Sequence, residues 1–566
     1  MSGIAGIVRL DGAPSDPKRL AEAMAHRAPI AVLRDSEDVV ADARIENGLT
    51  ILDAWRQWGE DCASHLEGDF AFAIMDARTR TLFCARDPFG VKPFVYAFLP
   101  GKLFAFASEA RALLAVDEIP RDVDEQRIAE YLDLRFDDAE RTFHRALRRL
   151  PGGCTLTLRD GKIAIRRYWS PRNVKPLRLR GGDAAYAEGY REHFLRAVRE
   201  RMQVAHPSEL GAMLSGGLDS SAIACVARDE LRAAGAPPLP VISWIFSDVM
   251  EADEREFQEP VLAAGGMRPL TLDSAHAGAS PWTDLELLLP DGPPYAPNFY
   301  LNTEAAKLAR SQGIRVLLDG LGGDVTVSRG GTRFVELFTR GRAITLAREL
   351  RALATRRGTT ESLPRLFFAN VAAPLAPRAL LRLLSRLRRR QYAEPRRFFS
   401  VRDEHLFQLE SPFLAEGLEL FDRVLAPFGI EGRYPFFDRR LAEYCLSLPA
   451  DQKLADGYSR MVARRAMEGI LPEAVRWRAG KGAPGLHIIA ALRANSPEWA
   501  DFFGRDAAAV EKWVDVDALR KTHGALTSGR PVDLKAAVRL WSAAALGRWL
   551  SGSYFHKPLV PAEDRS

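Results

Sequence analysis

Short apolar runs separated by turn residues dominate the N-terminal third of the chain. Five of them are typical of β-strands: Phe70–Met75, Thr81–Ala85, Leu103–Ala107, Thr155–Leu158 and Ile163–Tyr168. Runs of this length, rich in apolar residues and bounded by turn formers, indicate strands rather than helices. The pattern therefore predicts a first domain built mainly of β-sheet.

The pattern changes around residues 171–182, which are polar and contain proline and arginine. We place the domain boundary there and expect one domain over residues 1–175 and a second over residues 183–566. The second begins with strands at Gly211–Leu214, Val241–Phe246 and Ile314–Leu318, alternating with helices at Ala184–Met202, Ser220–Ala233 and Asn302–Ser311. Such alternation predicts right-handed crossovers and a parallel sheet, and after about Gly330 we expect mostly helix.

Composition places the chain among ordinary globular proteins. Of its 566 residues, 47% are hydrophobic and 27% charged, which argues against wholesale disorder. The sequence has no apolar run of the roughly 18 residues needed to span a membrane and no secretory signal, so we expect a cytoplasmic protein. Its five cysteines show no metal-ligand spacing, and we expect neither disulfides nor a zinc site.

The net charge of +5 is too small for the whole chain to indicate a nucleic-acid partner. Arginines and leucines are nevertheless interleaved between Arg378 and Arg397. This segment has two interpretations. It is an amphipathic helix with a solvated arginine face, or a cationic surface for an acidic partner.

The segment Met213–Ser221, with the sequence MLSGGLDSS, has the clearest chemistry. A strand ends there in Ser-Gly-Gly and a helix follows. Glycines permit close backbone approach, and serine hydroxyls with the amides of a helix N-terminus form a cradle for an anion. Asp219 would repel phosphate unless a divalent cation stood between them, so the motif predicts a site for magnesium pyrophosphate.

The string SGGLDSS resembles the signature of ATP-pyrophosphatase loop enzymes, which cleave ATP between the α and β phosphates and transfer AMP to an acceptor. Most of the chain also resembles asparagine synthetases, in the same order of motifs. The matching segments are MSGIAGI at the start, Leu66–Ala97, Phe104–Leu114, VLLDGLGGD at Val316–Asp324, EGRYPFFD at Glu431–Asp438 and the tail Lys453–Lys481.

This resemblance implies an α+β sandwich of the Ntn-hydrolase type, then an α/β ATP-pyrophosphatase domain, similar to the adenine nucleotide alpha hydrolases, with a helical C-terminal part. It also implies ATP and Mg²⁺ as cofactors. The positions that would bind ATP or pyrophosphate are Leu214, Ser215, Gly216, Gly217, Asp219, Ser220, Ser221, Ile245, Phe246, Asp319 and Gly320. Asp219 and Asp324 would hold the metal, and Lys481 would act on the reacting phosphate.

The first domain departs from the family at its glutaminase positions. Ser2 stands where asparagine synthetases carry an N-terminal cysteine nucleophile, and the Asn-Gly-Glu loop that holds glutamine is reduced to Asp42-Ala43-Arg44. The segment between Arg27 and Val39 is also shortened. A serine can act as an N-terminal nucleophile, but without the pocket we expect a scaffold that does not hydrolyse glutamine.

The second domain departs at the turn 320–325, whose sequence is GLGGDV. Leu321 and Val325 replace two glutamates of the family's Gly-Glu-Gly-Ser-Asp-Glu turn, which suggests a different acceptor. β-Lactam synthetases carry a tyrosine at the Leu321 position. The pattern most resembles lasso-peptide macrolactam synthetases, which implies a precursor peptide as substrate and a leader peptidase as partner.

Such an enzyme would adenylate an Asp or Glu side chain, and the N-terminal amine of the peptide would then attack. Glu431 is a candidate general base for that attack, and the alternative is an ion pair with Arg433 or Arg439. Two other functions stay open. One is an ammonia-dependent asparagine synthetase or a small-molecule amide or β-lactam ligase, and the other is an RNA-modifying ATP-pyrophosphatase.

Overall fold

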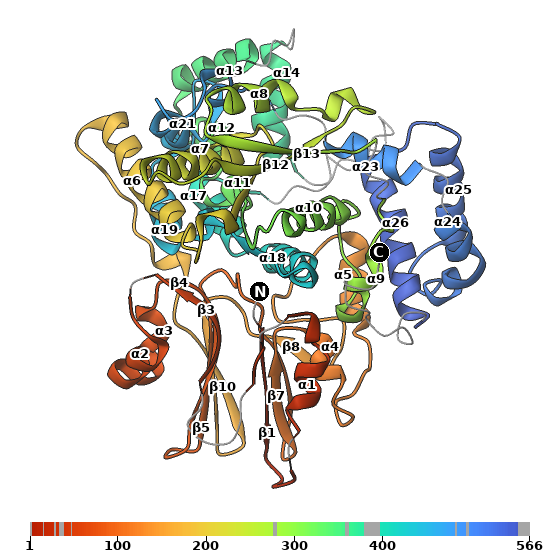
Figure 1. Ribbon diagram of the computed structural model, residues 1–566. Coiled ribbons are helices and arrows are strands. Elements are labelled where there is room, and N and C mark those ends of the chain that lie inside the picture. Colours follow the sequence, from red (N-terminus) through yellow and green to blue (C-terminus); the bar gives the residue numbers. More distant parts are fainter. Residues whose placement is uncertain are drawn as a thin grey trace.

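The structure is a computed structural model that describes residues 3–14, 16–27, 30–32, 39–46, 48–275, 280–356, 362–377, 397–480, 484–493 and 497–552. It has an N-terminal sandwich below and a larger α/β part above it in Figure 1. The last strand of the sandwich ends at Arg167, and the first long helix of the second part, α6, spans Gly182–Arg201. None of the helices in these ranges is long and apolar enough to cross a membrane.

The sandwich consists of two five-stranded sheets, with the orders β2-β1-β7-β6-β8 and β10-β9-β5-β4-β3. Their strands are β1 (Gly3–Arg9), β2 (Ile30–Val32), β3 (Val39–Ile45), β4 (Gly68–Asp76), β5 (Thr81–Arg86), β6 (Val95–Leu99), β7 (Leu103–Ala107), β8 (Leu147–Arg149), β9 (Cys154–Arg159) and β10 (Lys162–Arg167). The five strands predicted from the sequence are β4, β5, β7, β9 and β10, so the sheet-rich first domain is confirmed.

Aromatic side chains fill the space between the two sheets, where Phe94 stacks on Phe106 and Tyr96 on Phe104. Helices α1 (Lys18–Glu22) and α4 (Ala110–Leu114) cover one outer face, and α2 (Ile51–Trp58) and α3 (Cys62–His65) cover the other. Because β4, β5, β6 and β7 bury apolar residues on both faces of their sheets, they consist of nearly continuous apolar runs.

A five-stranded parallel sheet in the order β13-β12-β11-β14-β15 forms the centre of the second part. Its strands are β11 (Leu210–Met213), β12 (Leu239–Ile245), β13 (Met267–Asp273), β14 (Val316–Leu318) and β15 (Glu431–Arg433). Helices α6 and α7 (Leu218–Ala233) pack on one face, and α10 (Phe299–Ser311) and α18 (Pro412–Leu425) on the other. The predicted parallel sheet is confirmed, but β13 and β15 were not predicted.

Helices make up most of the chain after Gly330, as predicted. They include α12 (Arg333–Thr339), α13 (Ala343–Arg356), α14 (Leu363–Phe367), α17 (Val401–Leu409), α19 (Arg439–Ser447), α20 (Ala450–Lys453), α21 (Met461–Ala466), α23 (Pro484–Arg493), α24 (Pro497–Asp501), α25 (Val516–Thr527) and α26 (Leu534–Leu550). The last four pack around Trp282, Trp499 and Trp541 at the right of Figure 1.

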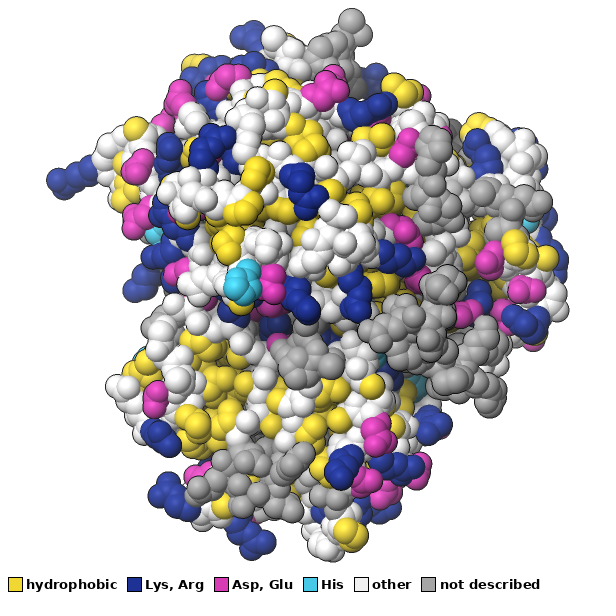
Figure 2. All heavy atoms as spheres, viewed as in Figure 1, with side chains coloured by type: hydrophobic (Ala, Val, Ile, Leu, Met, Phe, Trp, Pro, Cys, Tyr) yellow, Lys and Arg dark blue, Asp and Glu magenta, His cyan; other side chains and the backbone are white. Residues whose placement is uncertain are grey.

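Charged side chains of both signs are interspersed over both parts on the face seen in Figure 2. The arginine-rich segment starting at Arg378 lies outside the described residues, apart from Arg397. Its two interpretations therefore remain predictions.

Candidate active site

The predicted anion cradle lies between β11 and α7 at the carboxyl end of the parallel sheet. Gly216 has a φ of 72°, and a Cβ there would lie 2.9 Å from Phe257 Cβ, so the turn requires glycine. The Ser215 and Ser220 hydroxyl oxygens are 2.8 Å apart, and Ser215 Oγ accepts the Gly217 N–H at 3.3 Å. The two hydroxyls thus meet where α7 begins.

A second turn, residues 319–324, follows β14 and packs directly against the cradle. The register pairs Ala212 of β11 with Leu318 of β14, so both turns leave the sheet at the same edge. A Cβ at Gly320 would lie 2.7 Å from the backbone nitrogen of Ser220, and one at Gly323 would collide with the Asp219 carboxyl. Only glycine allows the two turns to approach this closely.

Asp219 and Asp324 converge on one guanidinium group, that of Arg460. Arg460 Nη1 lies 2.6 and 2.5 Å from the two carboxylate oxygens of Asp219 and 3.0 Å from Oδ1 of Asp324. Arg329 forms a second ion pair with Asp324. The two aspartates that the sequence assigned to a metal therefore lie together, and the sequence gave no sign that Arg460 joins them.

The two aspartates fit a magnesium ion. Their oxygens meet at one cation position, next to serine hydroxyls and a helix N-terminus, and Mg²⁺ prefers oxygen ligands of this kind. The Arg460 guanidinium takes that position in the structure, as expected where two carboxylates face one point.

Asp319 and Ser221 line the interior of the site. Burial raises the pKa of the Asp319 carboxyl to about 6, although its Oδ1 accepts the Leu321 N–H at 2.7 Å. Ser221 is fully buried, and its hydroxyl oxygen has no hydrogen-bond partner among the described residues. Leu214 is also buried and packs in the core beneath the loop 215–217.

Ile245 and Phe246 lie at the end of β12, next to the cradle. Met213 pairs with Ile242, so the last residues of β12 extend past the start of the loop. The Phe246 ring lies 4.7 Å from that of His487 on α23. This wall of apolar and aromatic groups is where the sequence placed the adenine.

Arg478 and Lys481 belong to the tail segment that resembles asparagine synthetases. Arg478 donates a hydrogen bond of 3.2 Å to the carbonyl of Gly216, and its guanidinium lies 3.9 Å from the Phe257 ring centre. It therefore supports the loop from its backbone side. Lys481 lies outside the described residues, and its role over the reacting phosphate remains a prediction.

The structure does not bring Glu431 to this cluster. It pairs with Val316, the first residue of β14, whereas the turn with Asp319 follows the last residue, so Glu431 lies toward the opposite end of the sheet. Its carboxylate contacts Arg433 at 3.1 Å and Lys92 at 3.7 Å.

The electrostatics of Glu431 also argue against a role as general base. Burial opposes its ionisation, but the charges of Lys92 and Arg433 outweigh burial and lower its pKa to about 2. So weak a base is a poor proton acceptor near neutral pH. The ion pair with Arg433, the alternative interpretation, is what the structure contains.

The residues that replace the glutamine-holding loop are also engaged in buried ion pairs. Asp42 Oδ1 is 3.0 Å from Lys92 Nζ, and Arg44 Nη2 donates to Asp69 at 2.7 Å. Arg44 also pairs with Glu46. Ser2 lies outside the described residues, so the absence of glutaminase activity remains a prediction.

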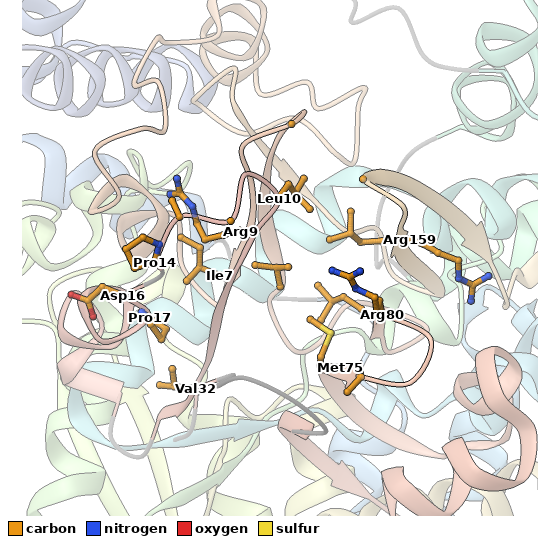
Figure 3. A pocket seen from close by; sticks show the side chains of 18 of the residues that line it. Ile7, Arg9, Leu10, Pro14, Asp16, Pro17, Val32, Met75, Arg80 and Arg159 are labelled. Carbon is orange, nitrogen blue, oxygen red and sulfur yellow. The ribbon is translucent and has the colours of Figure 1, made fainter.

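A cavity of about 1640 Å³ lies between strand ends of the sandwich, away from this site. Figure 3 shows Ile7, Arg9, Met75 and Arg159 around it. None of the residues predicted to bind ATP lines this cavity.

Comparisons with known proteins agree with this architecture. The profile of the Asparagine synthase family matches residues 189–551, and that of a Glutamine amidotransferase domain matches residues 48–169. Asparagine synthetase 3 of Bacillus subtilis, described as glutamine-hydrolyzing, is 26% identical over 448 residues, which cover 78% of this chain and 71% of the relative. Asparagine synthetase 1 of the same organism is 24% identical over 498 residues, covering 79% and 72%.

A shorter match is to Amidase chyE of Penicillium rubens, 29% identical over 184 residues, or 32% of this chain and 26% of the relative. A solved structure of the allosteric regulatory enzyme of purine biosynthesis aligns at 14% identity over 43% of this chain and 61% of that chain. Its TM-score of 0.18 is too low to support an argument.

The two family matches confirm the predicted fold classes, a glutamine amidotransferase sandwich followed by an ATP-pyrophosphatase domain. The first match spans more than half of the chain. We call the turns 215–221 and 319–324 together with Arg460 the loop cluster. Together with this cluster, the first match identifies the chain as a member of the asparagine synthase family and as an ATP-dependent, amide-forming ligase.

Proposed function

We propose that this ligase joins a carboxylate to an amine carried by its own substrate, and that the amine is not ammonia taken from glutamine. The observation that carries the proposal is the state of Asp42 and Arg44. Both stand where the family holds glutamine, and both are tied into buried ion pairs with Lys92 and Asp69. Glutamine would have to break these pairs to bind, and breaking buried pairs is costly.

The proposed reaction has two steps. The substrate carboxylate attacks the α-phosphorus of ATP, which forms an acyl-adenylate and releases pyrophosphate. A neutral amine then attacks the acyl carbon, the bond to AMP breaks, and an amide, AMP and one proton are formed. Ser215, Gly217 and Ser220 would hold the leaving pyrophosphate, because their donors meet at the N-terminus of α7.

Magnesium held by Asp219 and Asp324 would neutralise the charge of the triphosphate. Arg460, which bridges both carboxylates, would then turn toward the phosphates or remain beside the metal as a further positive charge. In either position it favours the build-up of negative charge in the first step.

The apolar residues of the turn 320–325 support a substrate larger than ammonia. Leu321 and Val325 belong to an apolar cluster with Phe89, Tyr434 and Phe437. An apolar wall suits the side chains of a peptide better than it suits a small polar nucleophile. We therefore propose macrolactam formation within a precursor peptide, between an Asp or Glu side chain and the N-terminal amine, with a leader peptidase as partner.

The second candidate is ammonia-dependent formation of asparagine or of another small amide. The names of the relatives favour it more strongly than macrolactam formation, because asparagine synthetases match about four fifths of this chain. The resemblance to β-lactam synthetases belongs to the same candidate.

Mass spectrometry of parallel reactions decides between the candidates. The full chain is incubated with ATP and magnesium and with aspartate plus ammonium, with aspartate plus glutamine, or with the peptide encoded beside its gene and the neighbouring peptidase. We expect the cleaved peptide to lose one water while AMP forms in step. The same peptide with an acetylated N-terminus is the matched control and should stay linear.

Efficient amidation of aspartate by ammonium, with the peptide unchanged, would replace the macrolactam proposal by the second candidate. Amidation with glutamine as the only nitrogen source would overturn the first proposal as well. RNA that copurifies and dissociates steeply with salt would instead revive the RNA-modifying class.

A further inference from the structure

A second cavity, separate from the loop cluster, lies between the linker and helices of the second part of the chain. It has a volume of about 490 Å³ and is formed by the linker residues 176–178, helices α12 and α13, the start of α17 and the segment from α19 to α20. We call it the linker cavity. Its size is in the range of sites for small molecules.

Positive charge dominates the lining of the linker cavity. The cationic residues are Arg178, Arg333, Arg340, Arg342, Arg402 and Lys453, whereas the acidic ones are Glu336 and Asp451. Glu336 is already occupied, since it pairs with Arg340 at 2.7 Å and accepts the Val401 N–H at 3.0 Å. The carboxylates of the cavity therefore do not balance its cations.

Most of these cations have no carboxylate within ion-pair distance among the described residues. Arg178 and Arg342 are exposed and form no ion pair with any residue that the structure describes. Within the described ranges, Arg402 donates to backbone carbonyls, those of Leu446 at 3.2 Å and of Val174. Several guanidinium groups that share one cavity without counter-charges repel one another, so the arrangement is costly until an anion enters.

Lys453 lies at the inner wall of the cavity. It is 1% exposed, and its amine lies 2.7 Å from Nδ1 of the fully buried His405 rather than beside a carboxylate. A buried amine without a counter-ion is expensive to keep charged. Burial accordingly lowers the pKa of Lys453 to about 7.

We propose that the linker cavity binds a small anion with several negative charges, of the phosphate or the polycarboxylate type. Arginine forks match both groups, because each presents paired oxygens to two N–H donors. The proposal does not depend on which amide the ligase forms.

A chain of hydrogen bonds connects the linker cavity to the loop cluster, so an anion bound in the cavity would affect the loop cluster. His405, which contacts Lys453 through Nδ1, lies 2.9 Å through Nε2 from the carbonyl of Thr326. Thr326 ends α11 (Gly323–Thr326), the short helix that carries Asp324. The inner wall of the cavity and a proposed metal ligand are thus joined by a short chain of hydrogen bonds.

Calorimetry with the full-length chain tests the proposal, with pyrophosphate and citrate as the two probes. The test variants are Arg178→Ala and Arg342→Ala, whose side chains are exposed and unpaired, so the fold should tolerate their loss. The matched controls are Arg180→Ala in the same linker and Arg348→Ala on α13, both exposed and both outside the cavity lining.

Hydrogen exchange read by mass spectrometry then locates the bound probe, because pyrophosphate can also bind the cradle. We expect protection in peptides that cover 333–342 and 446–453. Each test variant should weaken binding by about fivefold, and the controls should not. Binding of one probe alone would identify the anion class. Neither probe binding, equal losses in the controls, or protection confined to residues 213–221 would overturn the proposal.

Discussion

The two halves of the molecule use buried charge in opposite ways. In the sandwich, Asp42 and Lys92 pair with only 2% and 7% of their side chains exposed. In the loop cluster, Asp219 and Asp324 are 15% and 27% exposed and converge on one cation. In the sandwich these charges are sealed from solvent, whereas the loop cluster keeps its charges where a ligand can reach them.

This difference indicates where function and stability reside. A pair sealed from solvent resists exchange with a ligand and its loss lowers the stability of the fold, because removal of either partner leaves a buried charge without a counter-charge. A pair at an open edge contributes little to stability. Substitutions in the two halves should therefore affect different properties.

The sharpest test of the loop cluster is removal of its carboxylates. We expect Asp219→Ala and Asp324→Ala each to lower AMP formation about a thousandfold, because the triphosphate loses the charge that holds its metal. Thermal unfolding should change little in either variant. Asp229→Ala, on the exposed side of the same helix as Asp219, is the control and should keep full activity. Near-normal turnover in either test variant would refute the metal assignment.

The interface between the halves should show the reverse behaviour. Arg201 is fully buried and lies 3.1 Å from Asp69 and 3.4 Å from Asp438. Arg201→Met should lower the free energy of unfolding by about 3 kcal/mol, because it removes a buried cation and leaves Asp69 and Asp438 with one arginine partner each, Arg44 and Arg440. Arg199→Met, which loses only an exposed pair with Glu230, should cost less than about 1 kcal/mol in the same denaturant titration. Equal losses would remove the distinction between sealed and open pairs.

Acid should weaken the ion pairs that Glu431 forms with Lys92 and Arg433. The folded pKa of Glu431 is about 2, below its usual value in an unfolded chain, so its contribution is complete above about pH 4 and disappears as the pH falls toward 2. Glu431→Gln should therefore be less stable than the wild type by about 2 kcal/mol at neutral pH, and the two proteins should converge near pH 2. Glu188→Gln, an exposed change on α6, should run parallel to the wild type. A constant gap across the titration would contradict the pairing with Lys92.

The smallest expected effect is at the start of the sandwich. Ser2→Ala should leave amide formation unchanged, and the wild-type chain should release no glutamate from glutamine. Release of AMP measures amide formation, and an assay coupled to glutamate oxidation measures glutamine hydrolysis. Glutamine hydrolysis that disappears in Ser2→Ala would show that the sandwich is still an enzyme.

Much of the fold was accessible from sequence because its signals are local. Strands such as β4 and β5 are continuous apolar runs, and α7 follows a glycine-rich turn that is typical of a strand–turn–helix unit. β13 was missed because its exposed residues interrupt the apolar pattern, and β15 because it has only three residues. Short edge strands carry little periodicity of their own.

The same difference between local and non-local signals separates the parts of the site that the sequence predicted from those that it missed. The sequence by itself determined the cradle, because the hydroxyls, glycines and Asp219 lie within one turn whose conformation depends on neighbouring residues. Only the tertiary structure decided that Arg460 joins Asp219 to Asp324, since its position depends on contacts between segments far apart in the chain. The tertiary structure also decided that Glu431 lies away from the loop cluster. Strand register fixes which end of a parallel sheet a residue occupies, and the local sequence does not determine register.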